Sequence, residues 1–339
     1  EMQRSLVGSE MCIRDRECTL KAKSIDFRFV QDTVEVLGLE GQAYPGYTLR
    51  MFSDSAARVL KEFVFTRPVT LSGGGMFPMG DDMKLMKGRI RFDASAGRVR
   101  YPLLGTTLDL GRTKGEVLIS PQWVVVDKMM GTIWDGTFTG RVLAQIDDGD
   151  ALNGSFVLQD MNLTSIGKSY DKKMEKATVH GAIEFSSKGG NMNSIQAKGE
   201  AALVHGDLVE IPLFGFLGEA LSNYIPGLGH LINYKISRAD CDFSIEKGYV
   251  RTSNFAAQGS NMSLEGGGWI RLSDLQVNSD FKLGLRGFPG FITSPVFLLA
   301  GGLFQVRGTG PLSNVSWSFA PFSGGKAPIP PAAAPARKR

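Results

Sequence analysis

The stretch GTFTGRVLAQIDDGDALNGSFVLQDMNL, residues 136–163, carries the alternation that decides the fold. In each half, every second residue is apolar and its neighbours are polar, which is typical of a strand with one dry and one wet face. The acidic segment DDGD (147–150) separates the halves and predicts a turn between two antiparallel strands. The residues expected on the apolar face here are Phe138, Val142, Ile146, Phe156 and Leu158.

The same alternation recurs along most of the chain. It covers about residues 89–134, resumes in ATVHGAIEF (177–185), and continues after residue 240, restarted each time by short turn signals. Val179, Ile183 and Phe185 extend the apolar face in the second of these stretches. We therefore expect ten or more strands in a mainly β, antiparallel fold.

Composition narrows the function classes. The 339 residues carry a formal net charge of only +4, so no nucleic-acid partner is expected. The 42 glycines are spread without a collagen-like period, as strands and tight turns use them. Of the three cysteines only Cys241 lies well inside the predicted fold, so no disulfide framework is expected.

Catalytic and ligand-binding motifs are scarce. The three histidines His180, His205 and His230 have no second metal-binding residue at ligand spacing, and DDGD is not a complete calcium loop. The glycine runs in SGGGMF and EGGGW lack the Lys-Ser/Thr of a phosphate-binding loop, and we interpret them as strand turns or bulges. We expect no enzyme activity, no catalytic residue, no metal and no cofactor.

Three segments predict short helices instead of strands. SDSAARVLKEFV (53–64) and SPVFLLAGGLF (294–304) have helical apolar spacing or an opening proline. The clearest is the segment at about 211–225, which opens at Pro212 and is stopped by Pro226 and Gly227. Its apolar stripe consists of Leu213, Leu217, Leu221 and Ile225.

Several phrases in a fixed order resemble the C-terminal region of AsmA-like proteins (the AsmA/TamB type) of bacterial envelopes. They are GTFTGRVLAQI, VHGAIEFSSKGG, GDLVEIPLFGFL, MSLEGGGWI, LQVNSDFKL and FQVRGTGPLSNVSW, and they span roughly residues 130–320. The resemblance implies an elongated, curved antiparallel sheet that forms a U-shaped groove with an apolar concave side. It also implies a periplasmic protein, anchored in the inner membrane of a Gram-negative-type bacterium through an N-terminal helix, that moves lipids or supports outer-membrane biogenesis.

Under this hypothesis the eight apolar residues named above line a groove for the acyl chains of a phospholipid or similar lipid. The helix carrying Leu213, Leu217, Leu221 and Ile225 is expected to close one end of it. Three alternatives remain open: a sheet that seals on itself as a ligand-free structural scaffold, an outer-membrane-type β-barrel, and an enzyme on a β scaffold, for which no convergent carboxylates are evident.

The expected organisation has four parts. Residues 1–18 are excluded from the fold because SLVGSEMCIRDR (5–16) resembles a translated sequencing adapter, and the anchoring helix is then expected to be missing. Residues 19–130 form an upstream β and helical part, and residues 131–322 the AsmA-like β region. Residues 323–339 form a Pro/Ala tail that we expect to be disordered.

Overall fold

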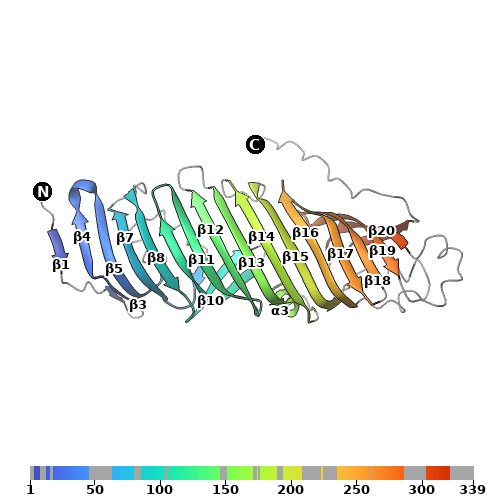
Figure 1. Ribbon diagram of the computed structural model, residues 1–339, viewed down its shortest axis with the longest axis horizontal. Helices are drawn as coiled ribbons and strands as arrows, with labels where there is room; N and C mark the ends of the chain where they lie inside the picture. Colours follow the sequence, from blue (N-terminus) through green and yellow to red (C-terminus); the bar gives the residue numbers. More distant parts are fainter. Residues whose placement is uncertain are drawn as a thin grey trace. The chain divides into compact units, whose positions relative to one another are not determined.

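The computed structural model is mainly β, with antiparallel strands and a single short α-helix in its described part (Figure 1). This confirms the predicted fold class of a mainly β, antiparallel sheet. The structure describes residues 4–7, 13–15, 18–45, 63–79, 85–103, 106–145, 151–170, 174, 176–188, 194–207, 223, 235–260, 262–285 and 303–320.

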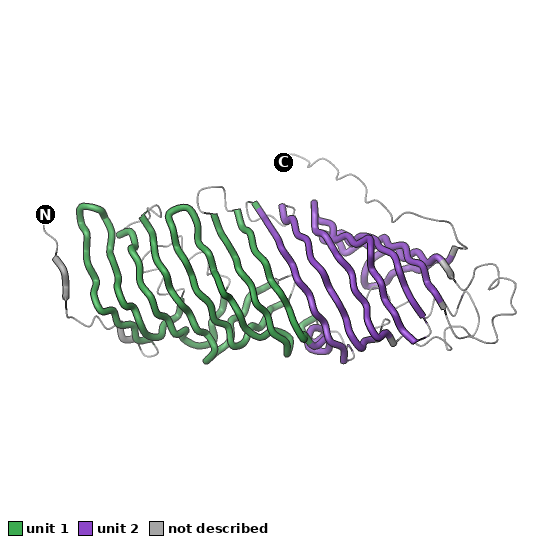
Figure 2. The backbone as a smooth tube through the Cα atoms, viewed as in Figure 1, with its two compact units in different colours: residues 1–161, 169–171, 188–190 green, residues 162–168, 172–187, 191–339 purple. Residues whose placement is uncertain are grey.

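The chain divides into two compact units, coloured separately in Figure 2. Unit 1 consists of residues 1–161, 169–171 and 188–190, and unit 2 of residues 162–168, 172–187 and 191–339. In each unit the described strands form an open sheet, because no pairing joins its first strand to its last.

Unit 1 is a sheet with the spatial order β1–β4–β5–β7–β8–β10–β11–β12–β13. Two long strands each pair with two shorter strands, one after the other, along the same edge. β5 pairs with β4 and then β3, and β10 pairs with β9 and then β8. The short β2 pairs with β3, and the short β6 pairs with β9. The strands are β1 (Arg4–Val7), β2 (Ile13–Asp15), β3 (Cys18–Lys21), β4 (Ser24–Arg28), β5 (Thr33–Ala43), β6 (Val64–Phe65), β7 (Val69–Pro78), β8 (Lys87–Asp93), β9 (Arg98–Leu103), β10 (Thr106–Ile119), β11 (Trp123–Ile133), β12 (Gly136–Gln145) and β13 (Leu152–Asn162).

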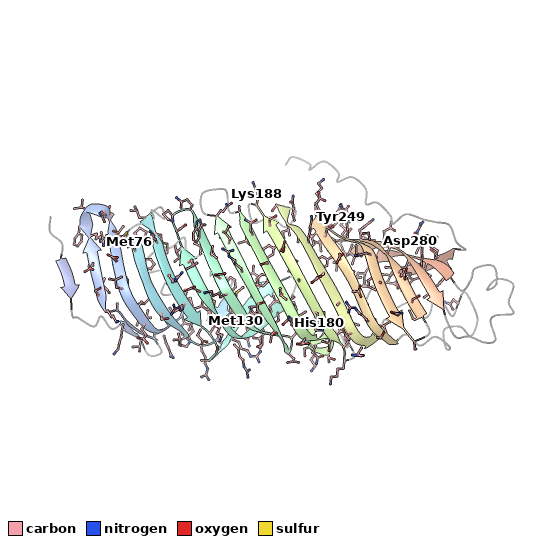
Figure 3. The ribbon with its side chains drawn as sticks, in the orientation of Figure 1. Met76, Met130, His180, Lys188, Tyr249 and Asp280 are labelled. Carbon is pink, nitrogen blue, oxygen red and sulfur yellow. The ribbon has the colours of Figure 1, made fainter. Side chains whose placement is uncertain are left out.

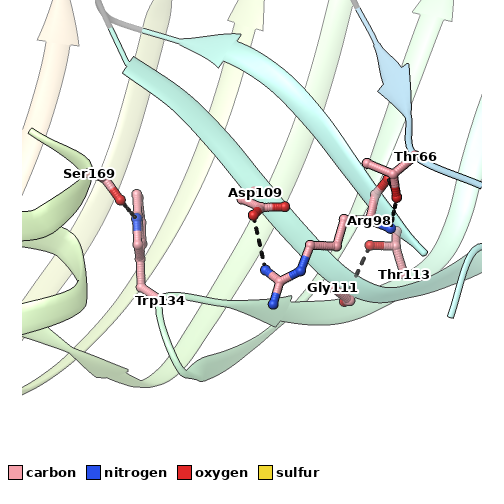
Figure 4. A network of polar contacts seen from close by, with 7 residues as sticks. All are labelled: Thr66, Arg98, Asp109, Gly111, Thr113, Trp134 and Ser169. Carbon is pink, nitrogen blue, oxygen red and sulfur yellow. Dashed lines mark hydrogen bonds and ion pairs between the residues drawn. The ribbon is translucent and has the colours of Figure 1, made fainter. Parts of the chain in front are cut away.

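Polar contacts lie beside the bulge of β10 (Figure 4). The register of β10 against β11 shifts between Gly111 and Glu116, and Arg112 has a left-handed φ of 48°. In the half before this bulge, Arg98 of β9 pairs with Asp109 at 3.0 Å and its backbone N–H donates to the Thr66 hydroxyl at 2.8 Å. Bulges bend the strand that carries them, so β10 can serve two neighbours in succession.

Unit 2 is a meander in which each strand pairs with its neighbours in sequence, in the order β14 to β21. The strands are β14 (Thr178–Ser187), β15 (Gln196–Asp207), β16 (Lys235–Glu246), β17 (Tyr249–Gly259), β18 (Met262–Arg271), β19 (Gln276–Leu285), β20 (Leu303–Pro311) and β21 (Ser316–Ala320). These strands follow the predicted alternation, which confirms antiparallel pairing in the second half of the chain.

Both glycine triplets lie inside strands and face a bulge on the neighbouring strand. Gly73–Gly75 of β7 lies opposite the register shift between Val36 and Leu39 of β5, and Gly266–Gly268 of β18 lies opposite the shift between Thr252 and Phe255 of β17. A Cβ on Gly74 or Gly267 would come within 2.4 or 2.3 Å of a carbonyl oxygen across the strand pair. The predicted bulges therefore exist, but the partner strands carry the extra residues.

The bulge in β17 is closed by a side chain. Asn254 accepts a hydrogen bond from the backbone N–H of Asp242 at 2.9 Å, and its amide donates to the Asp242 carboxylate at 2.7 Å. The Asn254 amide thus takes the place of a peptide group that the bulge has pushed out of register.

The described helical structure is brief. It consists of α3 (Leu163–Ser169), which the sequence analysis did not anticipate, and the 3-10 turn η1 (Phe29–Gln31). The predicted helices at 211–225 and 294–304 lie outside the described residues, apart from isolated positions and the start of β20. Of segment 53–64 only the last two residues are described, and Val64 belongs to β6. The helical segments among the described residues include none with the length and hydropathy of a transmembrane span.

Candidate functional site

The predicted site residues of unit 1 share one face of β12 and β13. Cross-strand register places Phe138 opposite Leu158, Phe156 opposite Gly140, and Val142 opposite Gly154. Residues directly opposite in an antiparallel pair point to the same side of the sheet. We call this side the apolar face of unit 1, defined by Phe138, Val142, Phe156 and Leu158.

This face is only partly covered. Phe138 is buried, with 4% of its surface exposed, whereas Val142, Phe156 and Leu158 are half-buried. Ile146, the fifth residue predicted for this stretch, lies outside the described residues.

Unit 2 repeats the arrangement on its first strands. Val179, Ile183 and Phe185 of β14 lie opposite Leu203, Gly199 and Ala197 of β15. The three β14 side chains are half-buried. We call this side the apolar face of unit 2, and its register continues through β16 to β21.

Aromatic side chains on both apolar faces lie over glycines of the next strand. In each case the ring occupies the space that a Cβ on the directly opposite glycine would need, with approaches between 2.4 and 3.0 Å. Sequence reasoning attributed the glycines to strands and tight turns and missed this pairing, although a glycine and an aromatic residue on facing positions of predicted hairpins would have been a usable signal. The pairs are Phe92 with Gly115, Phe138 with Gly131, Phe156 with Gly140, Phe243 with Gly199, Phe281 with Gly266, and Trp317 with Gly308.

The pairing has two physical consequences. A ring packed on a glycine shields the neighbouring backbone from water, which offsets the weakness of glycine in a strand. The ring also lies low across two strands instead of standing upright between side chains. At these positions each apolar face therefore presents an aromatic ring packed on the neighbouring backbone.

At its other end the apolar face of unit 2 is fully covered by its own side chains. Leu264, Leu283 and Val306, on β18 to β20, have no exposed surface. The Phe281 ring packs edge-on to Phe255 at 5.5 Å between centroids, and it lies 6.1 Å from Trp317. One sheet face thus changes from half-buried at β14 to closed at β19. Figure 3 draws the side chains on the strands and labels His180 of β14 and Asp280 of β19.

Unit 1 has two covered clusters on its own apolar side. One gathers around Val69 and Leu71 of β7 and includes Val99 of β9, while the other gathers around Phe77 and Val36. The half-buried residues of β12 and β13 belong to neither cluster. Unit 1 therefore also combines a packed part with a part that remains incompletely covered.

Cys241 of β16 is half-buried on the apolar face of unit 2, opposite Ala201. Burial raises the pKa of its thiol above the ordinary value, and the neighbouring carboxylates of Asp242 and Asp240 raise this pKa further. The thiol is thus kept in its neutral form at neutral pH, which suits an apolar surface and not a nucleophile.

The candidate polar residues named in the sequence analysis are only partly described by the structure. His180 and His205 come from β14 and β15, and His230 and DDGD lie outside the described residues. The described residues contain no cluster of three or more His, Cys, Asp or Glu that could hold a metal. The most buried carboxylate of unit 2, Asp280, accepts hydrogen bonds from Gln305 at 2.7 Å and Arg307 at 2.9 Å.

The predicted groove-end residues Leu213, Leu217, Leu221 and Ile225 all lie outside the described residues. Whether they close an apolar groove stays a prediction.

In comparisons with known proteins, no family model, no curated protein and no solved structure matches the chain.

Proposed function

We propose that the protein binds lipid acyl chains on its apolar faces and performs no catalysis. The observation that carries this proposal is the incomplete burial of the apolar residues on β12 to β14. Val142, Phe156, Leu158, Val179, Ile183 and Phe185 are all half-buried on the sides of their strands that a core would normally cover.

The energetics favour a hydrocarbon ligand on such a surface. Each methylene moved from water to an apolar contact contributes about 0.8 kcal/mol, so a few contacts along a chain give useful affinity. The low aromatic–glycine surface suits an extended, flexible chain, because it offers contact area without requiring one specific shape. A polar ligand would need converging donors and acceptors, and the apolar face offers few of them.

The buried residues of β18 to β20 limit how far a bound acyl chain can extend along unit 2. An acyl chain can lie along β14 to β16, but at β18 to β20 the positions it would need are filled by Leu264, Leu283 and Phe281. We propose that a bound chain ends before these strands.

The resemblance to AsmA-like proteins supports the cellular setting. We propose a periplasmic protein of a Gram-negative-type bacterium, anchored in the inner membrane by an N-terminal helix, that conducts lipid between membranes or supports outer-membrane biogenesis. A ligand-free structural scaffold is the second candidate, and the closed packing at β18 to β20 is the observation that favours it.

Lipid analysis of purified protein tests the proposal. Protein purified from bacteria is extracted and its phospholipid quantified by mass spectrometry, for the wild type and for Phe156→Glu and Ile183→Glu. We expect roughly stoichiometric lipid with the wild type and a loss of most of it with each variant, since a charged group on the apolar face would have to be desolvated against hydrocarbon.

Matched controls place the same charge on the other face of the same strands. Val157, which is 43% exposed, and Ala182 are the sequence neighbours of Phe156 and Ile183 and point the opposite way. Val157→Glu and Ala182→Glu are expected to retain lipid. Wild-type protein without lipid, or equal lipid in all four variants, would establish the scaffold instead.

A further inference from the structure

Four exposed cations lie on the side of unit 1 opposite to its apolar face. Arg89 and Arg91 alternate with the inward-facing Ile90 of β8, Lys128 comes from the bulge of β11, and Arg141 comes from β12. Their side chains are between 60% and 74% exposed. We call these four residues the basic patch.

Three members of the basic patch surround one buried carboxylate. Glu116 of β10 lies directly opposite Arg91, and its side chain is only 8% exposed. Its oxygens are 3.4 Å from Arg89 Nε, 3.5 Å from Arg91 Nε and 3.9 Å from Lys128 Nζ. The three cationic side chains therefore converge on the Glu116 carboxylate.

The basic patch has more positive than negative charge. Arg141 pairs with Asp127 at 3.6 Å, so four cations face two carboxylates and leave an excess of two positive charges. The formal net charge of the whole chain is +4. A local surplus of two positive charges therefore lies within a few neighbouring positions of four adjacent strands.

The contact geometry favours phosphate as the counter-ion. Both arginines approach Glu116 most closely through Nε, while most of each side chain remains in solvent. A guanidinium with free Nη groups binds phosphate oxygens in a bidentate manner. The guanidinium groups of Arg89 and Arg91 and the ammonium of Lys128 surround Glu116. Together they can bind several phosphates of an anionic surface.

We propose that the basic patch docks unit 1 onto an anionic lipid surface. Charge complementarity supports this occupant. On β7, Ser72 and Gly74 lie opposite Arg91 and Arg89, whereas on β10 the half-buried Leu118 lies opposite Arg89. Stable protein interfaces usually have an apolar or aromatic centre, whereas a membrane surface is bound by clustered cations alone. This contact lies on the outer side of the sheet and does not depend on lipid occupying the apolar face.

Vesicle co-sedimentation tests the docking. The full chain is mixed with phosphatidylcholine vesicles that contain or lack phosphatidylglycerol. The test variant combines Arg89→Gln, Arg91→Gln and Lys128→Gln with Glu116→Gln, so that no unpaired buried carboxylate remains. The control variant, Arg98→Gln with Arg238→Gln and Lys247→Gln, removes three exposed cations that each lie beside a carboxylate elsewhere.

We expect the wild type and the control variant to bind the anionic vesicles, and the test variant, which loses a net two positive charges, to bind them about thirtyfold more weakly at low salt. Binding by the wild type should fall as salt is raised. Equal binding by the test variant, with unchanged circular dichroism, would overturn the proposal. So would complete displacement of the wild type by millimolar inorganic phosphate, which would indicate a small-anion site.

The outcome is independent of the lipid analysis. Protein that carries no acyl chain but binds anionic vesicles through the basic patch would contradict the proposed function and leave this inference intact. Protein that carries lipid, but whose test variant binds vesicles normally, would support the proposed function and contradict this inference.

Discussion

Strands β14 and β19 alternate apolar and polar residues in the same way, yet they end in different environments. On β14, Ile183 and Phe185 are half-buried, whereas on β19, Phe281 and Leu283 are almost completely buried. Their own residues do not explain the difference, because both strands present aromatic and aliphatic side chains on the same face. Burial is decided by neighbouring strands, which at β19 contribute Leu264, Val306 and Trp317. Alternation therefore identifies the dry side of a strand but does not show whether protein covers it.

The largest expected effect comes from truncating an aromatic residue in each region. Phe281→Ala should lower the free energy of unfolding by about 3–5 kcal/mol, because a fully buried ring leaves a cavity. Phe185→Ala should cost less, about 1–2 kcal/mol, since its side chain is only partly buried and leaves a smaller cavity. Chemical denaturation measures both. Equal losses would contradict the contrast between closed and open regions.

A second pair of variants tests the glycine that lies opposite the bulge of β17. Gly267→Ala should cost about 1–3 kcal/mol, because the new Cβ would lie 2.3 Å from the Thr252 carbonyl oxygen and 2.7 Å from the Ser253 Cα. Gly181 of β14 is the matched control, as its Cβ would meet only one carbonyl oxygen, at 3.2 Å. Gly181→Ala is expected to leave the thermal midpoint nearly unchanged. A tolerated alanine at position 267 would refute the role of the glycine.

The side chain that closes the β17 bulge gives a smaller effect. Asn254→Ala removes two hydrogen bonds to Asp242 and should cost about 1 kcal/mol, since both are solvent-exposed. Hydrogen exchange should accelerate at the Asp242 amide, which loses its acceptor, and stay unchanged in β14. Uniform acceleration across unit 2 would indicate a global loss of stability instead of a local opening.

The smallest effect concerns Cys241, which lies between the two regions on β16. Because burial and two nearby carboxylates raise the pKa of its thiol, the folded state holds the proton more tightly than the unfolded chain. The free energy of unfolding should therefore decline slightly as pH rises above the ordinary thiol pKa of about 8.5. In a Cys12→Ser, Cys18→Ser background, iodoacetamide should label Cys241 more slowly than it labels denatured protein at about pH 8. Equal rates would contradict the pKa shift.

Strand identity and the apolar side could be predicted from sequence, whereas their coverage could not. The period-two pattern placed Phe138, Phe156 and Ile183 on the apolar side of their strands because alternation is a local property. The bulge at Arg112 escaped prediction, and the one at Asn254 lies on the partner of the strand that was expected to carry it, since an extra residue in a strand is defined only against its partner.

The aromatic–glycine pairs could not be predicted for the same reason. A glycine beneath Phe243 or Phe281 is recognised only when the register across two strands is known, and in the sequence it resembles any turn glycine. The basic patch was also missed, because Arg89, Arg91 and Lys128 are ordinary polar-face residues until Glu116 brings them to one point. The helix α3 carries no amphipathic stripe long enough to be recognised.

The consecutive pairing of unit 2 has a consequence for how this part of the chain is made. Each strand needs only the strand before it as a template, so the sheet can lengthen by one hairpin at a time as polypeptide is delivered. Contacts remain between chain neighbours, which keeps loop-closure entropy low and resembles growth in repeat proteins. Gene duplication of a hairpin could therefore extend the molecule without redesigning what had already folded.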